Sequence, residues 1–389
     1  MKKQFKVSII VPGKFHSFYL AQGLQKKGVL HSLITSYPKY LVKKYNIKKE
    51  FIKSIFIKEI IERILLKINF TFLLSKLYFF INNLFENLSI SKIDFDKINI
   101  LVAWSGSAEK SFKKINVLKK KVIKVLERGS THIQFQNKIL HEEFKILKIQ
   151  KKPIDQRIIE KEIREYKLAD YIFVPSSFAK KTFIENGVSE NKIIKVPYGT
   201  DLNEFYLDNK YNEEFTIISA GQISIRKGSL YLLKAFQELN LEKSKLLMIG
   251  NVEKELFPHL KPYLLNPKII FQNHVSQNRL RLFYNKSNIF VTSSLEEGLA
   301  MVQIQAMACG LPLICTRHSG GEELVDEGKN GYICPIRDTE YLKKKILSLY
   351  KDKSQLKSFS ESAQIKAKNN FSWENYTENI YSEYQKLLS

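Results

Sequence analysis

Short apolar runs alternate along the chain with longer segments in which apolar residues recur at helical spacing. Runs that are apolar on both faces and separated by helices are typical of parallel sheets covered on both sides. The predicted strands are Val7–Val11, Ile98–Val102, Val122–Leu126, Tyr171–Val174, Ile193–Val196, Phe215–Ala220, Leu246–Ile249, Ile269–Phe271, Ile289–Thr292 and Leu313–Cys315.

The series is interrupted near Pro197–Asp201, and the following residues 202–214 are polar with little periodicity. Two series of strands and helices predict an α/β protein of two doubly wound, Rossmann-like domains with a cleft between them. A chain of 389 residues is long enough for two cores. We place the first domain at residues 1–200 and the second at 201–370. Residues 371–389 form a predicted amphipathic helix, with Ser372 as its N-cap, that can return to the first domain.

Residues 40–90 combine apolar residues at helical spacing with many lysines. This pattern suits a helix lying on an anionic membrane. It equally suits a helix that packs its apolar side on the sheet and leaves its basic side in solvent. The most apolar stretch, residues 68–85, contains Lys76 and three asparagines, so a buried helix is favoured over a membrane span.

Composition limits the compartment and the partners. The net charge of +24 favours anionic partners, although the abundance of Lys, Ile and Asn also indicates an AT-rich genome. Three cysteines without a close pair predict neither disulfides nor a zinc site. The first apolar run ends at Pro12, too early for a signal peptide. We therefore expect a cytoplasmic protein.

Two alternative chemistries find little support. Asp94-Phe95-Asp96 has the form of a metal-binding Asp-x-Asp, but it precedes a predicted strand instead of following one. No phosphate-binding Gly-x-x-x-x-Gly-Lys-Ser/Thr is present, and the lysine-rich segments lack the modules of nucleic-acid readers. We expect no metal and no nucleic-acid partner.

The segment 292–312 carries the strongest motif: a strand, a tight Glu296-Glu297-Gly298 loop, and a helix that begins near Met301. The free N–H groups of such a helix form an anion site suited to a diphosphate. Gly298 allows close approach of the backbone, and Glu297 is placed to bind sugar hydroxyls. The position of Glu296 in this loop predicts a solvent-exposed carboxylate. Gly310-Leu311-Pro312 ends the helix.

This segment resembles the signature of the family-4 (group 1) retaining glycosyltransferases, which have the GT-B fold. The shared pattern is Glu297-Gly298, then Ala306-Met307-Ala308-Cys309-Gly310 and Pro312. The resemblance implies that Glu297 orients the donor sugar and that Leu299, Ala300 and Met301 face the donor. Gln305 stands where the family has a second glutamate, which usually holds the ribose hydroxyls. Glutamine keeps an acceptor oxygen but loses the charge.

A second segment, residues 219–228, resembles the family's Gly-Arg…Lys-Gly turn after the first strand of the donor domain. Gly221 matches, and Lys227 falls on the lysine that neutralises the donor diphosphate. Gln222 replaces the family arginine, and Arg226 supplies a neighbouring charge. The simpler interpretation is a basic turn that caps a helix. Further matches fall at residues 168–178, 196–205, 319–323 and 330–332.

The first half of the chain matches the family less specifically. Gly13 lies where the family often has a glycine-rich phosphate loop. The family places a histidine near the reacting sugar, and His132 is the candidate, with His16 as a second. The alternative for His132 is a histidine that caps a local helix.

The resemblance implies a retaining, metal-independent enzyme without a cofactor, which moves a sugar from a nucleotide-sugar to a glycan or lipid-linked acceptor. Surface polysaccharide synthesis at the inner face of the cell membrane is the expected setting. The alternative is a catalytically inactive glycosyltransferase-like binding subunit, with Gln222 and Gln305 as signs of lost activity. An epimerase or a phosphorylase on the same fold is a third hypothesis.

Overall fold

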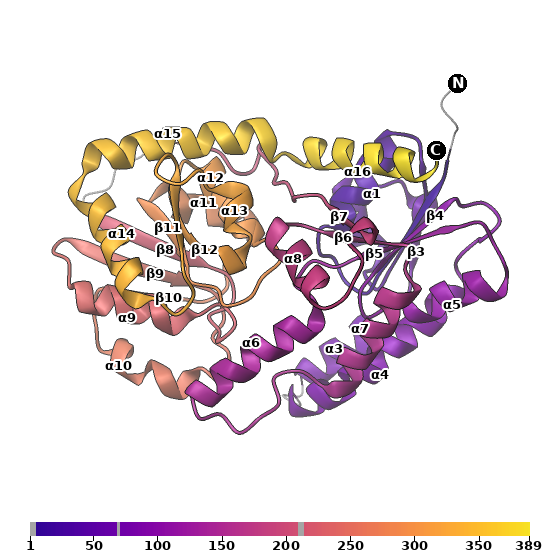
Figure 1. The fold of residues 1–389 in the computed structure, drawn as a ribbon, viewed down its shortest axis with the longest axis horizontal. Helices are drawn as coiled ribbons and strands as arrows, with labels where there is room; N and C mark the ends of the chain where they lie inside the picture. The colour runs from indigo at the N-terminus through magenta and orange to yellow at the C-terminus, as the bar shows by residue number, and fades with distance from the viewer. Residues whose placement is uncertain (1–4, 68–70, 209–213) are drawn as a thin grey trace.

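The computed structural model describes residues 5–67, 71–208 and 214–389, and it places two parallel sheets side by side (Figure 1). The first sheet has the strand order β3-β2-β1-β4-β5-β6-β7 and the second the order β10-β9-β8-β11-β12-β13. In each sheet the order reverses beside the first strand, which is the doubly wound topology. The strands are β1 Val7–Val11, β2 Leu30–Thr35, β3 Ile52–Ser54, β4 Ile100–Trp104, β5 Ile123–Glu127, β6 Tyr171–Val174, β7 Ile193–Lys195, β8 Phe215–Ala220, β9 Ser244–Ile249, β10 Ile269–Gln272, β11 Ile289–Thr292, β12 Leu313–Thr316 and β13 Gly331–Cys334.

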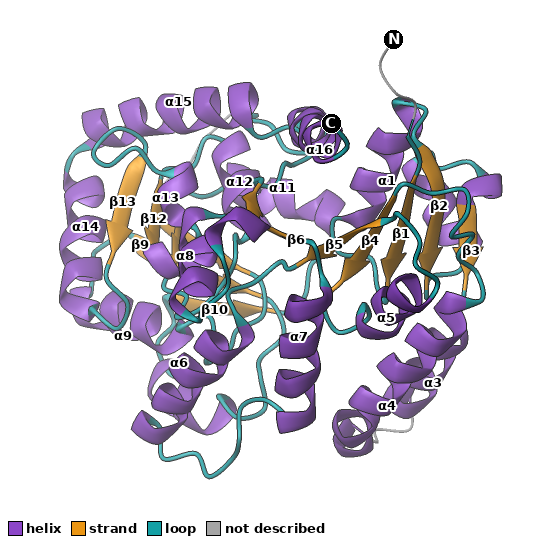
Figure 2. Ribbon diagram, turned by 45° about the vertical axis from the view of Figure 1, so that its right-hand side comes forward, coloured by secondary structure: helices purple, strands orange, loops and turns teal. Residues whose placement is uncertain are grey.

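Helices cover both faces of each sheet (Figure 2). Three buried clusters fill the space between sheets and helices, and a small fourth one lies between α6 and the second domain. The helices are α1 Ser17–Lys26, α2 Lys39–Val42, α3 Ile57–Lys67, α4 Thr71–Ile90, α5 Glu109–Val117, α6 Ile133–Ile146, α7 Gln156–Leu168, α8 Ser177–Glu185, α9 Ser229–Leu239, α10 Lys261–Leu264, α11 Gln277–Asn285, α12 Met301–Ala308, α13 Gly321–Leu324, α14 Thr339–Lys351, α15 Lys353–Asn370 and α16 Trp373–Leu387.

Every predicted strand is present in the structure, displaced by two residues at most. Three strands, β2, β3 and β13, were not predicted. In β2 the apolar residues are interrupted by His31 and Ser32. The buried Ser32 hydroxyl is hydrogen-bonded to the Ser8 hydroxyl at 2.8 Å, which offsets the cost of burying it. The strands β3 and β13 lie at sheet edges, where one side of the strand needs no continuous apolar pattern.

The chain crosses between the two domains twice, and the two crossings lie against each other. Thr200 on the first crossing forms a parallel bridge with Ser372 on the second, and the Thr200 N–H donates to the Phe371 carbonyl at 2.8 Å. A Cβ atom on Gly199 would lie 2.4 Å from the Ser372 carbonyl oxygen, so the close approach requires glycine there. Before the second crossing α15 follows the second domain, and after it α16 returns along the first (Figure 1).

The helix α6 also joins the domains. It leaves the first sheet after β5, and Phe144 near its end belongs to the core of the second domain. The Glu143 carboxylate on α6 accepts from the Tyr231 hydroxyl at 2.8 Å and pairs with Arg337 at 2.8 Å, both from the second domain.

The basic segment 40–90 contains α2, β3 and a hairpin of α3 and α4. The interpretation as helices packed on the fold holds for part of the segment, because its apolar residues are divided between core and surface. Ile81 and Phe85 are buried, whereas Phe56, Ile57, Ile60 and Ile64 are exposed. The predicted helix over 68–85 includes residues 68–70, which lie outside the described residues; its remainder belongs to α4. No helix among the described residues is long and apolar enough to cross a membrane.

The contact of α16 with α1 gives a test of the second crossing. A Cβ atom on Gly23, within α1, would lie 2.1 Å from the Thr377 hydroxyl oxygen of α16. Gly23→Ala should therefore lower the free energy of unfolding by about 1–3 kcal/mol, although alanine normally favours a helix. Urea denaturation measures the change. Adding Thr377→Ala should recover part of the loss, and equal stability of Gly23→Ala and the parent would contradict this packing.

Candidate active site

Two loops of the second domain meet at the carboxyl edge of its sheet. One follows β8 and reaches α9 through Arg226, Lys227 and Gly228; the other follows β11 and reaches α12. The Leu295 N–H donates to the Arg226 carbonyl at 2.9 Å, and the Ser293 hydroxyl donates to the Gly228 carbonyl at 2.8 Å. Gly228 has a φ of 59°, and a Cβ there would lie 2.1 Å from the Ser293 carbonyl oxygen, so only glycine fits.

The joined loops bring together the charges that the two motifs carry. Arg226 lies 2.9 Å and Lys227 2.5 Å from the same carboxylate oxygen of Glu297. Burial, together with the neighbouring Arg226, lowers the pKa of Lys227, against the effect of Glu297. Two cations that converge on one carboxylate oxygen form a site that suits an anion with several oxygens, such as a diphosphate.

Glu296 is not the solvent-exposed loop carboxylate that its position in a turn suggested. It is fully buried between the domains. From the first domain it accepts the Thr131 N–H at 3.1 Å, the Thr131 hydroxyl at 2.6 Å, the Gln136 amide at 2.9 Å and the Ser130 hydroxyl. From the second domain Arg226 donates to it at 3.3 Å. Burial opposes the charge, but Arg226 and the hydroxyl donors outweigh it and lower the pKa of Glu296.

The same loop makes a close backbone contact with the first domain. A Cβ on Gly298 would lie 2.4 Å from the Gly129 carbonyl oxygen of the first domain. The Ser176 hydroxyl, also from the first domain, donates to the Gly298 carbonyl at 2.6 Å. Leu299 and Ala300 follow, both buried, and α12 begins at Met301 without a side-chain cap. The helix N-terminus is therefore available to an anion beside Lys227.

A pocket of about 420 Å³ opens beside these loops, at the carboxyl ends of β8 and β9. Gly221, Gln222 and Gln305, all named from the sequence, line it. Val275, Leu280 and Val302 add apolar surface, and Asn251, His274 and Gln277 add polar groups. A pocket with apolar walls and a few polar side chains suits a heterocyclic base and its ribose. Asn251, His274 and Gln277 were not found from the sequence, because each lies in an ordinary polar loop or helix start.

His132 lies at the N-terminus of α6, in the capping position that was the alternative to a catalytic role. Its Nδ1 accepts the Gln134 N–H at 3.3 Å, and its ring packs on Tyr166 and Phe183. Only 2% of the residue is exposed. Burial, with Arg128 nearby, lowers the pKa of His132 to about 4. A neutral, enclosed imidazole of this kind is typical of a structural histidine.

His16 and Gly13 likewise do not line this pocket. His16 is buried among the rings of Trp104, Tyr198 and Tyr376. The Gly13 carbonyl accepts from the Thr35 hydroxyl at 3.3 Å in a turn after β1.

The described residues contain no group of three His, Cys, Asp or Glu side chains that is placed to hold a metal ion. Asp94 and Asp96 pair instead with Lys97 and Lys120. The three cysteines, Cys309, Cys315 and Cys334, are buried thiols.

The arrangement of two doubly wound domains, with the donor-type loops of one facing the loops of the other, defines a GT-B fold. The comparison with solved structures agrees. Sucrose-phosphate synthase from Thermosynechococcus elongatus aligns with a TM-score of 0.74 at 16% identity, over 99% of each chain. Anabaena HepE in complex with UDP aligns with a TM-score of 0.69 at 14% identity, over 98% of this chain and 100% of that one.

Within this fold, residues 206–366 match the family described as glycosyl transferases group 1, which confirms the resemblance seen in the motifs. The capsular polysaccharide biosynthesis glycosyltransferase CapM of Staphylococcus aureus is 30% identical over 237 residues, which are 56% of this chain and 62% of CapM. The uncharacterized glycosyltransferase MJ1069 of Methanocaldococcus jannaschii is 25% identical over 315 residues, 77% of this chain and 78% of that protein.

The buried state of His132 predicts a pH dependence of stability. Below pH 6.5 the unfolded chain binds a proton that the folded chain does not bind until about pH 4, so stability falls as the pH falls through this window. Asn keeps the capping oxygen but does not titrate. Between pH 7 and pH 5, His132→Asn should therefore lose about 1–2 kcal/mol less unfolding free energy than the parent. Urea denaturation at both pH values measures the difference. Equal losses would show that His132 is accessible to protons.

Proposed function

We propose that this chain is a retaining glycosyltransferase that moves a sugar from a nucleotide-diphosphate sugar to a glycan or lipid-linked acceptor in surface polysaccharide synthesis. The observation that carries the proposal is the placement of Arg226, Lys227 and the free N-terminus of α12 beside a pocket suited to a nucleoside. Relatives support the setting: CapM is named for capsular polysaccharide biosynthesis, and WcaL of Salmonella typhimurium for colanic acid biosynthesis.

The donor binds in the second domain. Gln305 and Gln222 contact the nucleoside in the pocket, and the diphosphate takes the place that Glu297 holds between Arg226 and Lys227. Displaced from its cations, Glu297 is free to accept hydrogen bonds from the donor sugar. The printed complexes of HepE with UDP and with UDP-glucose support a uridine nucleotide as the first donor to test.

The reaction breaks the bond between the anomeric carbon and the β-phosphate oxygen while the acceptor hydroxyl attacks from the same face. Its proton passes to the departing phosphate oxygen. Arg226, Lys227 and the α12 N-terminus stabilise the charge that develops on the diphosphate. Because these groups supply positive charge from the protein, we propose that the reaction needs no divalent metal and no cofactor.

The acceptor reaches the cleft from the first domain, at the inner face of the cell membrane. The exposed apolar residues of α3, with lysines 43, 44, 48 and 49 exposed in the preceding segment, suit attachment to an anionic surface.

A donor screen tests the function. The protein is incubated with UDP-, GDP- and other nucleotide-sugars, with and without EDTA, and thermal stability and nucleotide release are recorded. Stabilisation and EDTA-resistant release with one donor are expected. Absence of any response would favour the inactive binding subunit, and loss of release in EDTA would contradict metal independence.

The role of Lys227 is tested with the responding donor. Lys227→Ala removes one cation from the leaving group and should lower turnover by about 10²–10³-fold. Lys234→Ala is the matched control, because Lys234 lies on the surface of the following helix α9 and pairs only with Glu238 in the described structure. Unchanged turnover in Lys227→Ala would overturn the assignment of this residue.

Membrane attachment is tested by sedimentation with vesicles of phosphatidylcholine and phosphatidylglycerol. The double variant Ile60→Asp/Ile64→Asp should weaken binding by about tenfold or more, because two exposed apolar side chains no longer enter the lipid. Ile365→Asp, at an exposed isoleucine of α15 in the second domain, should bind like the parent. Equal binding of all three proteins, or none by the parent, would contradict attachment through α3.

A further inference from the structure

A second, smaller pocket lies in the first domain, at the point where its strand order reverses. We call it the α4 pocket. It has a volume of about 90 Å³ and is bounded by Pro12 after β1, residues 105–107 after β4, and Tyr78, Phe79 and Asn82 on α4. Ligands of doubly wound sheets bind at this edge, outside the carboxyl ends of the two diverging strands.

Two polar atoms in the lining of the α4 pocket are buried and have no partner within the described structure: Asn82 Oδ1 and Ser107 Oγ. Asn82 is 9% exposed and Ser107 is fully buried. A buried polar atom without a hydrogen bond destabilises the fold, so a native structure retains such atoms where something else bonds them. Asn82 offers an acceptor, and Ser107 offers a donor and an acceptor.

The walls of the α4 pocket are aromatic. Tyr78 is 46% exposed and Phe15 is 56% exposed, so both present ring surface to whatever enters. Phe79 is held in place by the Arg157 guanidinium, 5.1 Å from its ring centroid. Rings beside a few fixed polar groups suit a ligand that has an apolar face and hydroxyls on its edge.

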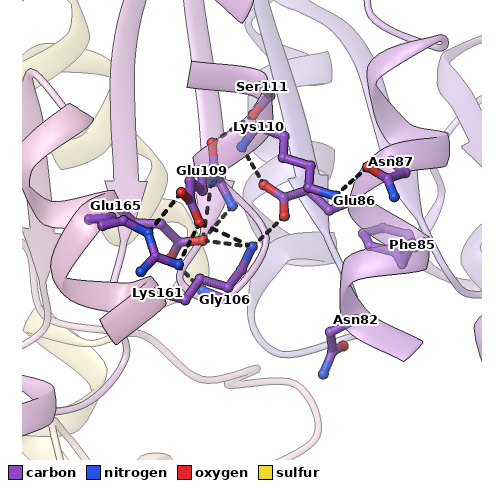
Figure 3. Close-up of polar contacts among 12 residues, drawn as sticks. Asn82, Phe85, Glu86, Asn87, Gly106, Glu109, Lys110, Ser111, Lys161 and Glu165 are labelled. Atoms are coloured by element: carbon purple, nitrogen blue, oxygen red, sulfur yellow. Dashed lines mark hydrogen bonds and ion pairs between the residues drawn. The ribbon is translucent and has the colours of Figure 1, made fainter. Parts of the chain in front are cut away.

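The floor of the α4 pocket excludes an anion. Lys161 is the cation of the lining, but Glu86, Glu109 and Glu165 converge on it (Figure 3). The backbone N–H groups at the N-terminus of α5, which would otherwise bind a phosphate, already donate to carboxylates. The Glu165 carboxylate accepts the N–H groups of residues 106, 108 and 109 at 2.6, 2.9 and 3.2 Å, and Glu86 accepts that of residue 110 at 2.6 Å. A phosphate here would face carboxylates without a free cation.

The α4 pocket is connected to the donor loop by one arginine. Arg128 donates to the Ser105 hydroxyl at 3.3 Å at the pocket and to the Thr131 carbonyl at 3.1 Å. Thr131 in turn donates to the Glu296 carboxylate, which lies in the loop between β11 and α12. A ligand in the α4 pocket therefore lies on the side of the first domain that contacts the donor site.

From these observations we infer that the α4 pocket holds an uncharged sugar ring of the acceptor, with Asn82 and Ser107 binding its hydroxyls and the aromatic walls packing on its apolar face. The inference rests on the proposed function, since it names the acceptor of that reaction. It assigns the pocket to the glycan end of the acceptor and not to a phosphate of a lipid carrier.

The test measures direct binding of simple probes by saturation-transfer NMR and does not depend on turnover. The probes are methyl glycosides of common neutral sugars and the corresponding sugar phosphates. At least one neutral glycoside should bind, and its phosphate should bind more weakly. Binding of phosphates alone, or of no probe, would overturn the inference.

Substitutions of the two polar residues test whether the glycoside binds in the α4 pocket. Ser107→Ala and Asn82→Leu should each weaken the glycoside by about fivefold or more, while the thermal stability of the free protein stays nearly unchanged. Each variant removes an oxygen without a partner, and Asn82→Leu also removes the bond from the Asn82 amide nitrogen to the Tyr78 carbonyl at 3.0 Å. A purely structural role would lower stability instead. Ser111→Ala is the matched control: Ser111 is equally buried but bonded to the Ala108 carbonyl at 3.0 Å and lies outside the pocket lining. Glycoside binding that is unchanged in both pocket variants would overturn the inference.

The donor screen separates this inference from the proposed function. If a nucleotide-sugar still stabilises the protein while glycoside binding fails, only the α4 pocket assignment is wrong. If glycosides bind through Asn82 and Ser107 but no nucleotide-sugar does, the proposed transfer is wrong and the chain is a glycan-binding protein.

Discussion

The Glu296 carboxylate, buried between the two domains, is the contact on which the geometry of the site depends. Four of its hydrogen bonds come from one short stretch of the first domain, and the fifth comes from Arg226 of the second. A buried carboxylate is costly unless it is fully bonded, so both domains must meet in this register for the charge to be tolerated. The adjacent Glu297 and Gly298 are thereby held at the interface, where a donor sugar and an acceptor would come together.

The contact of Glu296 with both domains also determines how Arg226 is hydrogen-bonded. Arg226 divides its hydrogen bonds between Glu296, which belongs to the interface, and Glu297, which belongs to the donor loop. Binding of a diphosphate at Lys227 and Arg226 would therefore act on both carboxylates at once. In the proposed function, the Arg226 guanidinium would couple donor binding to the contact between the domains through side-chain movements alone.

The two domains use the edges of their sheets differently. In the second domain the helix N-terminus after β11 is uncapped and lies beside two cations, which suits an anion. In the first domain the helix N-terminus after β4 is filled by Glu165, and the remaining space is aromatic and polar without free charge. The same topology thus offers a charged site on one side of the cleft and a neutral one on the other, which suits the proposed transfer of a sugar from a diphosphate to a glycan.

The sequence alone determined the fold class, most strands and the donor loops, because these depend on local patterns: continuous apolar runs, glycines that permit close contact, and a short motif with fixed spacing. The positions of Gln305 at the pocket and of Lys227 beside Glu297 follow from this short motif and its spacing. It could not determine the environments of Glu296 and His132, because their partners lie far away in the chain. The carboxylate of Glu296 in the Glu296-Glu297-Gly298 loop looks exposed until the first domain covers it. Likewise, only the packed structure shows that Tyr166 and Phe183 enclose the His132 ring. The unpartnered atoms of Asn82 and Ser107 also arise only when α4 is placed over β4, since hydrogen bonding between distant segments is a property of the tertiary structure.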